Sequence, residues 1–324
     1  MSFSSLYSCE SFYKIRYGLI VPLVTLAACC TIGILIPWEW LDPRQCDNSV
    51  NTSTLGWIRL GGAIGKGSFS VVLEGMVLAT KQLVAVKIGV EQDAGLWRDE
   101  QILGAVNGSD LFPYYYGSGW LGCTHRSGRS SRYPFIVLEL LGPPLTQDFE
   151  GNETADRIVK AIKIADQLVR AVEIMHKQLG YVVHDMYPNN VLGKLSDSSQ
   201  VKLVDFGEVI RTDLHAKDHS WGPAMTYTPL NSMFSSIRED KREALSQRDD
   251  LERVVYLMII LARGADIPWA NRKMKAEMSL ENICAGMPIE FVTLLRYARE
   301  TLRFQEDIDF VYVGALLKSA ITRK

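Results

Sequence analysis

The stretch that decides the fold is Val183-His184-Asp185-Met186-Tyr187-Pro188-Asn189-Asn190, and a second acidic motif follows it, Asp205-Phe206-Gly207. Two other motifs precede it: a glycine-rich stretch, Gly65-Lys66-Gly67-Ser68-Phe69-Ser70, and a lysine that closes an apolar run, Val84-Ala85-Val86-Lys87. Each motif alone is weak evidence, because glycine turns, lone lysines and Asp-Phe-Gly tripeptides also serve ordinary structural purposes. Their order along one chain is far more specific.

Composition excludes several classes of protein. The 324 residues are enough for a large core, and a formal net charge of -2 leaves no basic tract for nucleic acid, so we expect no nucleic-acid partner. The cysteines after residue 38 are Cys46, Cys123 and Cys284, which form no metal-binding cluster. Because none has an evident partner, they favour a reducing compartment.

A long apolar run lies near the start of the chain. No charged residue occurs from Tyr17 to Trp38, and a helix needs about 20 apolar residues to cross a bilayer. We therefore expect a transmembrane helix over 17–38 that contacts the membrane and anchors the protein in a single pass. The alternatives are a buried core helix and a cleaved signal peptide.

The side of the membrane stays open. Lys14 and Arg16 precede the apolar run and favour export of the residues on its carboxyl side. Three Asn-x-Ser/Thr sequons point the same way, at Asn51, Asn107 and Asn152. The unpaired cysteines point to the cytoplasm, so both a cytoplasmic and a lumenal domain remain possible.

The rest of the pattern predicts an α+β fold. Alternating and β-branched segments at 57–60, 71–74, 83–87 and 135–139 predict a small strand-rich lobe. From residue 154 apolar residues recur at helical spacing, and Val254 to Leu261 predicts a buried helix of a larger helical lobe. The expected organisation is an N-terminal segment (1–16), the transmembrane helix (17–38), a linker (39–57) and a bilobal domain (58–320).

In this order the four motifs resemble the signature of protein kinases. A Gly-x-Gly turn between two strands lets backbone amides approach phosphate oxygens, and Lys87 can project toward the α- and β-phosphates. The lysine needs an acidic partner on the next helix. The usual register selects Asp99, but Glu100 is adjacent, and positions about 100° apart on a helix cannot both face Lys87.

The remaining motifs supply a base and metal ligands. Asp185 is placed to accept the proton of an attacking hydroxyl, while Asn190 and Asp205 are placed to hold Mg²⁺ on the phosphates of ATP. A predicted hairpin, with strands at 191–193 and 201–204, would bring these two metal ligands together. The catalytic set is thus Lys87, Asp99, Asp185, Asn190 and Asp205.

Within protein kinases, residues 58–318 resemble the casein kinase I family. Three segments carry this likeness: Leu138 to Leu145, Arg248 to Glu252, and Ile283 to Phe291 with the residues after them. The resemblance implies Leu138 as the residue that guards the adenine pocket, backbone contacts to the adenine from Glu139 to Leu141, and Asp250 bracing the catalytic loop. The residues expected to contact the nucleotide are Ile64, Gly65, Gly67, Ser70, Val72, Ala85, Lys87, Leu138, Glu139 and Leu141.

The departures from that family concern charge. Members usually carry arginine where His184 stands and a lysine that contacts the γ-phosphate where Tyr187 stands. Losing a cation there would slow transfer, because electrostatic stabilisation dominates phosphoryl transfer. The family's Gly-Thr-Ala-Arg-Tyr segment reads Gly222-Pro223-Ala224-Met225-Thr226-Tyr227 and lacks the arginine, so a preference for acidic primed substrates is not expected.

Three functions therefore compete. The first is an ATP-dependent serine/threonine protein kinase that transfers the γ-phosphate to protein hydroxyls, with Asp185 as base and with ATP and Mg²⁺ as cofactors. The second is an impaired pseudokinase that acts as a membrane-tethered binding module, motivated by His184 and Tyr187. The third is a lumenal kinase that acts on secreted proteins or glycans.

Overall fold

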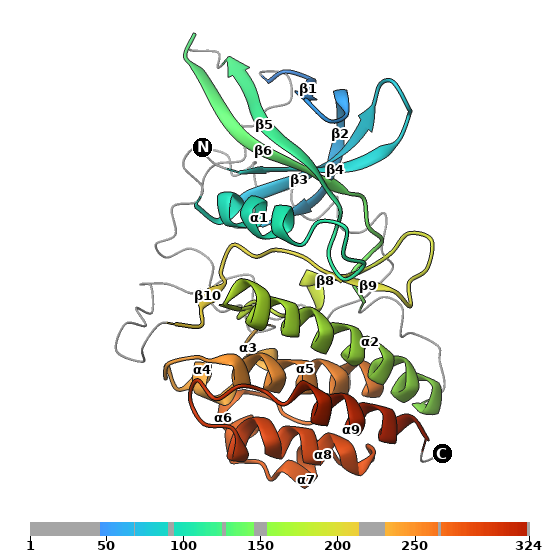
Figure 1. The fold of residues 1–324 in the computed structure, drawn as a ribbon, viewed down its shortest axis with the longest axis vertical. Helices are drawn as coiled ribbons and strands as arrows, with labels where there is room; N and C mark the ends of the chain where they lie inside the picture. Colours follow the sequence, from blue (N-terminus) through green and yellow to red (C-terminus); the bar gives the residue numbers. More distant parts are fainter. Residues whose placement is uncertain are drawn as a thin grey trace, which may run out of the picture. The chain divides into compact units, whose positions relative to one another are not determined.

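The computed structural model describes residues 46–67, 69–89, 94–124, 128–145, 154–213, 231–264 and 267–322. These residues belong to one unit, Glu39–Lys324, with most strands gathered at one end and most helices at the other (Figure 1). The α+β, two-lobed arrangement expected for the domain is confirmed.

A six-stranded antiparallel sheet, in the order β1-β2-β3-β4-β6-β5, forms the smaller lobe. Its strands are β1 (Ser49–Thr52), β2 (Gly56–Lys66), β3 (Ser70–Val77), β4 (Leu83–Gly89), β5 (Tyr115–Thr124) and β6 (Ser130–Glu139), and helix α1 (Ala94–Ala105) packs on the sheet. All four segments predicted as strands of this lobe lie in β2, β3, β4 and β6. Alternation decides which side faces inward, as in β2, where Ile58 is buried between exposed Trp57 and Arg59.

Strands β1 and β5 were not predicted. β5 contains three glycines, which are uncommon in strands, but Gly119 is required by packing: a Cβ there would lie 2.7 Å from the Phe135 ring. β1 falls inside residues 39–57, the segment expected to be a linker. It lies against β5 as well as β2, so the two edges of the sheet approach each other.

A disulfide joins Cys46 to Cys123 of β5, with their Cα atoms 3.9 Å apart, and the neighbouring Asp47 amide donates to the Gly122 carbonyl at 2.9 Å. The expectation of unpaired cysteines is therefore wrong for this pair. The cause is the close approach of two edges 77 residues apart in sequence, which spacing does not reveal. Cys284 is free and buried.

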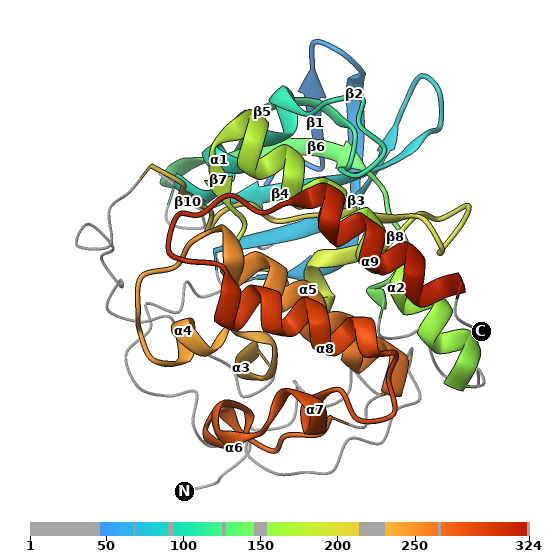
Figure 2. The same ribbon diagram turned by 60° about the horizontal axis from the view of Figure 1, so that its bottom comes forward.

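The larger lobe is built on α2 (Thr154–Ile174) and α5 (Gln247–Arg263), which pack against each other. Figure 2 shows α9 (Phe310–Thr322) lying beside α2 and α8 (Ile289–Arg296). Because α5 is covered by α2 and α8, every residue from Asp249 to Ala262 is buried, and the buried helix predicted over Val254–Leu261 is confirmed.

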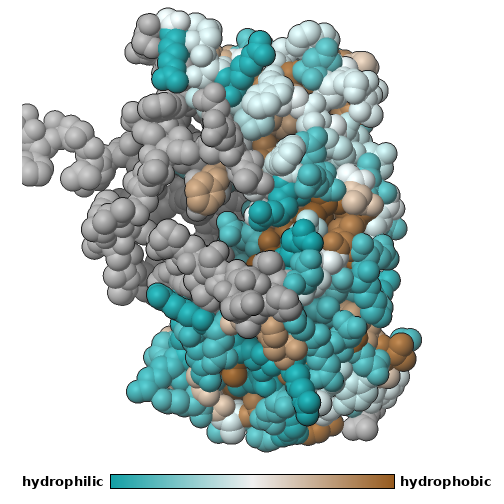
Figure 3. Space-filling view, turned by 60° about the vertical axis from the view of Figure 1, so that its left-hand side comes forward, coloured by the Kyte–Doolittle hydropathy of each residue, from teal (hydrophilic) through white to brown (hydrophobic). Residues whose placement is uncertain are grey.

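Shorter elements complete this lobe. They are η3 (Met175–Leu179), β7 (Tyr181–Val182), η4 (Pro188–Asn190), β8 (Val191–Gly193), β9 (Val201–Leu203), β10 (Ile210–Arg211), α3 (Asn231–Phe234), α4 (Ile237–Asp240), α6 (Arg272–Glu277), α7 (Leu280–Ile283) and η6 (Tyr297–Thr301). In Figure 3 apolar surface gathers at mid-height, at the level where the two lobes meet, and hydrophilic surface surrounds it.

The expected membrane anchor needs correction. Among the residues that the structure describes, no helix combines the length and the apolar character needed to cross a bilayer. The predicted transmembrane helix and the single-pass membrane localisation that rested on it are therefore not supported. Residues 17–38 themselves lie outside the described part of the chain.

Candidate functional site

The site forms around Lys87, which projects from β4 into a cluster of acids. Its Nζ lies 2.5 Å from Asp99 Oδ2 on α1 and 2.9 Å from Asp205 Oδ1, which follows β9. Asp99 is 1% exposed, whereas the Asp205 side chain is 43% exposed. The cluster therefore has one buried carboxylate that anchors the lysine and one that still faces solvent.

The same geometry separates Asp99 from Glu100. Asp99 also accepts a hydrogen bond from the Phe206 amide through Oδ1, at 2.5 Å. Glu100 points to β5, where its Oε1 accepts from the Tyr115 hydroxyl at 2.8 Å and from Ser118 Oγ at 2.5 Å. Asp99 is thus the residue that faces Lys87, and its short side chain reaches because α1 lies close to the Asp205–Gly207 turn.

Electrostatics keep Lys87 charged. Burial by itself lowers the pKa of a lysine, but the negative charges of Asp99 and Asp205 outweigh it and raise the pKa of Lys87 above its ordinary value. The ammonium is therefore present at neutral pH. It is a fixed positive charge at the inner end of the site.

The glycine-rich turn joins β2 to β3. The Gly67 amide donates to the Ser70 carbonyl at 2.9 Å, and Phe69 at the tip is 58% exposed. Among the residues that the structure describes, a Cβ on Gly67 would meet only Ser70, at 3.5 Å and beyond, so packing against these residues does not require glycine there. A ligand that approaches the backbone would require it.

An apolar surface lies beside Lys87 on the same face of the sheet. Ala85 precedes Lys87 by two positions in β4, and Val72 of β3 pairs with Lys87 directly. Leu138 of β6 pairs with Ala85 and is 9% exposed, while Ile64 of β2 is 49% exposed. Such a surface suits a flat apolar group.

The segment after β6 is fixed through Glu139. Its amide donates to the Tyr114 carbonyl at 2.8 Å, and its carboxylate accepts from the Tyr114 amide at 3.1 Å and from Lys202 Nζ at 2.7 Å. The Glu139 side chain is therefore occupied. The groups that remain for a ligand in Glu139 to Leu141 belong to the backbone.

Asp185 lies in the loop between β7 and η4. Nδ2 of Asn190 donates to both the carbonyl and Oδ2 of Asp185, each at 2.8 Å. Burial, followed by the charge of Asp205, raises the pKa of Asp185 to about 6, although His184 and the Asn190 hydrogen bond act in the opposite direction.

The predicted hairpin is present. β8 pairs antiparallel with β9, and the Val204 amide donates to the Asn190 carbonyl at 2.9 Å. Asn190 and Asp205 therefore lie at the same end of the hairpin. Asp205 adopts φ 66°, a left-handed backbone conformation that is uncommon outside glycine, and the buried Phe206 packs on Phe112.

Asp250, at the start of α5, braces the Asp185 loop. Its carboxylate accepts from the Val183 amide at 2.7 Å and from the His184 amide at 3.0 Å, and His176 Nε2 lies 2.8 Å away. Burial opposes ionisation, but the contact with His176 and the charges of His176 and Arg253 hold the pKa of Asp250 below its ordinary value. His184 sits in this brace at φ 63°.

Sequence reasoning missed several supporting residues. Arg253 pairs with Glu239 and lies 3.4 Å from Asp250, and His184 Nε2 lies 3.3 Å from Glu239. Arg98 Nη1 donates to the Gly207 carbonyl at 2.7 Å. Their spacing in the sequence carried no signal, except that Arg253 follows Asp250 by one helical turn.

Tyr187 does not reach toward the acidic cluster as a cation would. It is 6% exposed, and its ring meets Phe234 edge-on with centroids 6.2 Å apart. Burial, and then the negative charge of Glu239, raise the pKa of its hydroxyl above the ordinary range. The side chain is therefore a neutral part of the helical core.

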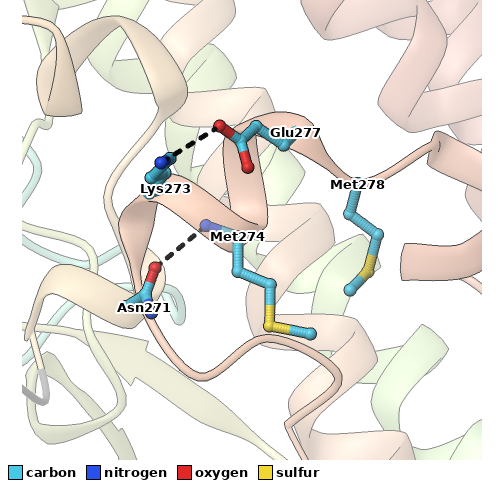
Figure 4. Close-up of a pocket in the computed structure, with 5 residues that line it drawn as sticks. All are labelled: Asn271, Lys273, Met274, Glu277 and Met278. Atoms are coloured by element: carbon cyan, nitrogen blue, oxygen red, sulfur yellow. Dashed lines mark hydrogen bonds and ion pairs between the residues drawn. The ribbon is translucent and has the colours of Figure 1, made fainter.

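Two further features of the chain are not part of the described site. A shallow hollow of about 420 Å³ lies on α6, lined by Asn271, Lys273, Met274, Glu277 and Met278 (Figure 4). The Asn271 side chain accepts a hydrogen bond from the Met274 amide, and Lys273 faces Glu277. None of the predicted site residues is among the five that line this hollow. The segment Gly222–Tyr227, singled out from the sequence, lies outside the described residues.

Comparison with known proteins agrees with this arrangement. A model of the protein kinase domain matches residues 58–229, more than half of the 324 residues. Casein kinase I homolog 2 of Schizosaccharomyces pombe is 29% identical over 294 residues, which cover 83% of this chain and 64% of that protein. The chain thus spans less than two thirds of this relative's length.

A solved structure of vaccinia related kinase 3 shares the fold. It superposes with a TM-score of 0.58 at 18% identity and covers 84% of this chain and 89% of that one. This likeness concerns the fold, whereas the match to the protein kinase domain over residues 58–229 includes Lys87, the Asp185 loop and Asp205. The chain belongs to the protein kinase family.

Proposed function

We propose that this protein is an ATP-dependent serine/threonine protein kinase of the casein kinase I type, with Asp185 as the base. The observation that carries the proposal is the charged Lys87 held between Asp99 and Asp205, because it pairs a fixed cation with a carboxylate that still faces solvent. The relative from Schizosaccharomyces pombe, by its name, supports the casein kinase I type.

The described residues fit a nucleotide. Val72, Ala85 and Leu138 form an apolar surface beside Lys87, as an adenine ring requires. The backbone of Glu139 and Leu141 would meet the edge of the base, since the Glu139 side chain is occupied elsewhere. Ile64 would cover the ring, and the backbone of Gly65, Gly67 and Ser70 would approach the phosphates.

The donor atoms also fit Mg²⁺. Asn190 uses its amide nitrogen on Asp185, so the amide oxygen is the atom left for a cation. Asp205 uses Oδ1 on Lys87 and keeps a second carboxylate oxygen on a side chain that is 43% exposed. Amide and carboxylate oxygens are the ligands that Mg²⁺ prefers. When bound, the ion neutralises charge on the phosphate oxygens.

Each of these residues would then have its own role in phosphoryl transfer. Lys87 holds the phosphates by charge, and Asp99 holds Lys87. Asp185 orients the substrate hydroxyl and accepts its proton as the new O–P bond forms and the bond to the leaving diphosphate breaks. Asn190 keeps the Asp185 carboxylate in one orientation through its hydrogen bond. The expected substrates are therefore proteins with serine or threonine hydroxyls.

A test is transfer of labelled γ-phosphate from ATP with Mg²⁺, by the full chain, to itself and to a generic protein substrate. The matched variant is Asp185→Asn, which keeps the size of the side chain and removes the base. We expect transfer to be lost in the variant while ATP binding persists, because Lys87 and the glycine-rich turn are untouched. Undiminished turnover by Asp185→Asn would refute the assignment of the base.

A pseudokinase that serves as a binding module is the second candidate. The buried ring of Tyr187 favours it, since no cation stands where kinases of this type carry a lysine. Saturable ATP binding with no transfer to any of a panel of protein substrates would select this function over the first.

A further inference from the structure

The disulfide indicates the chemistry of the compartment in which the domain folds. Cys46 and Cys123 come from segments 77 residues apart and meet in a β-bridge, so the pairing is part of the sheet. Disulfides of this kind form and persist in oxidising compartments and are rare where thiols are kept reduced. Other features of an oxidising, secretory environment should then be visible on the same lobe.

Asn51 is such a feature. It begins the sequon Asn51-Thr52-Ser53 at the end of β1, just before the turn to β2. Val50 and Thr52 are buried, at 3% and 5% exposure, so alternation turns Asn51 outward. Its side chain is exposed, and so is Ser53, whose hydroxyl completes the sequon.

An exposed aromatic ring stands directly opposite. Trp57 of β2 pairs with Asn51 across the hairpin and is 56% exposed. Directly opposed side chains have Cβ atoms about 5 Å apart, within reach of the first sugar on the asparagine. The flat indole offers an apolar surface on which the C–H face of a pyranose can pack, with its own N–H at the edge.

In the second described sequon, the side chain of Asn107 is hydrogen-bonded to the backbone. Asn107 Nδ2 donates to the Tyr115 carbonyl at 2.9 Å, and its Oδ1 accepts from the Tyr115 amide at 3.0 Å. Both ends of this amide hold the start of β5, so a sugar on Nδ2 would compete with the fold. Asn152 lies outside the described residues.

We propose that Asn51 is a site of N-linked glycosylation and that Trp57 packs against the attached sugar. In the step, the amide nitrogen of Asn51 bonds to the anomeric carbon of an oligosaccharide carried on a lipid diphosphate. The bond from that carbon to the diphosphate breaks, and the amide loses one proton. This assignment is independent of the proposed kinase activity.

The first test is the mass of the full chain produced in a eukaryotic secretory cell line, before and after an N-glycosidase, with free thiols trapped by alkylation at lysis. We expect Cys46 and Cys123 to resist alkylation and the glycosidase to remove sugar mass. That mass should fall by one glycan in Asn51→Gln and Ser53→Ala and stay unchanged in Ser53→Thr and Asn107→Gln. An unmodified chain, or a sugar mass that Asn51→Gln leaves unchanged, would overturn the assignment.

The second test isolates the contact with Trp57. Thermal unfolding is measured for the glycosylated chain and for Ser53→Ala, which keeps Asn51 but carries no sugar there. The same pair is then measured with Trp57→Ala added to both. We expect loss of the glycan to lower the Tm with Trp57 and to change it far less with Trp57→Ala. If loss of the glycan changes the Tm equally with and without Trp57, the stacking contact is refuted. The modification site itself is decided by the first test.

Discussion

Breaking the disulfide between Cys46 and Cys123 should strongly destabilise the strand-rich lobe. The perturbation is Cys46→Ala, chosen because Cys46 is partly exposed while Cys123 is 3% exposed, so the change removes the cross-link without truncating the buried side chain. Without the bond, the edge strand β5 is no longer linked covalently to the segment that precedes β1. The comparison is with the oxidised wild-type chain.

The size of the effect depends on the loop that the bond closes. For a sequence separation of 77 residues the loss of chain entropy in the unfolded state corresponds to about 4.5 kcal/mol. In a domain of this size a change of 1 kcal/mol moves the Tm by roughly 2–4 °C, so we expect a drop of about 9–18 °C.

The assay is thermal unfolding of the oxidised and the dithiothreitol-reduced chain, wild type and Cys46→Ala. Reduced wild type should have the same Tm as the variant, and the reductant should leave the Tm of the variant unchanged. Cys284→Ala is the matched control, because Cys284 is free and buried, and it should keep the full response to reductant. If oxidised wild type and Cys46→Ala melt within about 2 °C of each other, the entropic reasoning is refuted.

Three other predictions concern the site. Asp99→Ala should lower kcat/KM about 10²-fold by releasing Lys87, whereas Glu100→Ala should have little effect on transfer because Glu100 faces β5; equal losses would contradict the geometry. The pKa of Asp185, raised by burial and Asp205, means the base is protonated below pH 6, so kcat/KM should rise with pH through about 6, and a profile flat from pH 5 upward would argue against Asp185. Tyr187→Lys should cost about 3 kcal/mol in the free energy of unfolding, since it removes a buried ring from Phe234, while Tyr187→Phe should cost less than about 1 kcal/mol; denaturant titration that ranks them equally would refute the packing role.

The sequence by itself determined the family and the elements that show a clear periodicity. Glycines before an alternating strand, a lysine that closes an apolar run, and Asp185, Asn190 and Asp205 at hairpin spacing are local patterns, and their consequences are local as well. The strands β2, β3, β4 and β6, the hairpin of β8 and β9, and the buried α5 result from periodicity, because one face or all faces of each element must leave water.

Tertiary structure decided the features that depend on contacts between distant segments. It chose Asp99 over Glu100 because α1 turns one face to Lys87 and the other to β5. It joined Cys46 to Cys123 because the sheet brings its two edges together, and it made a strand of the glycine-rich β5 because Phe135 fills the space beside Gly119. It also buried Tyr187 against Phe234. Spacing along a chain carries no information on such contacts, since they depend on how the whole domain packs.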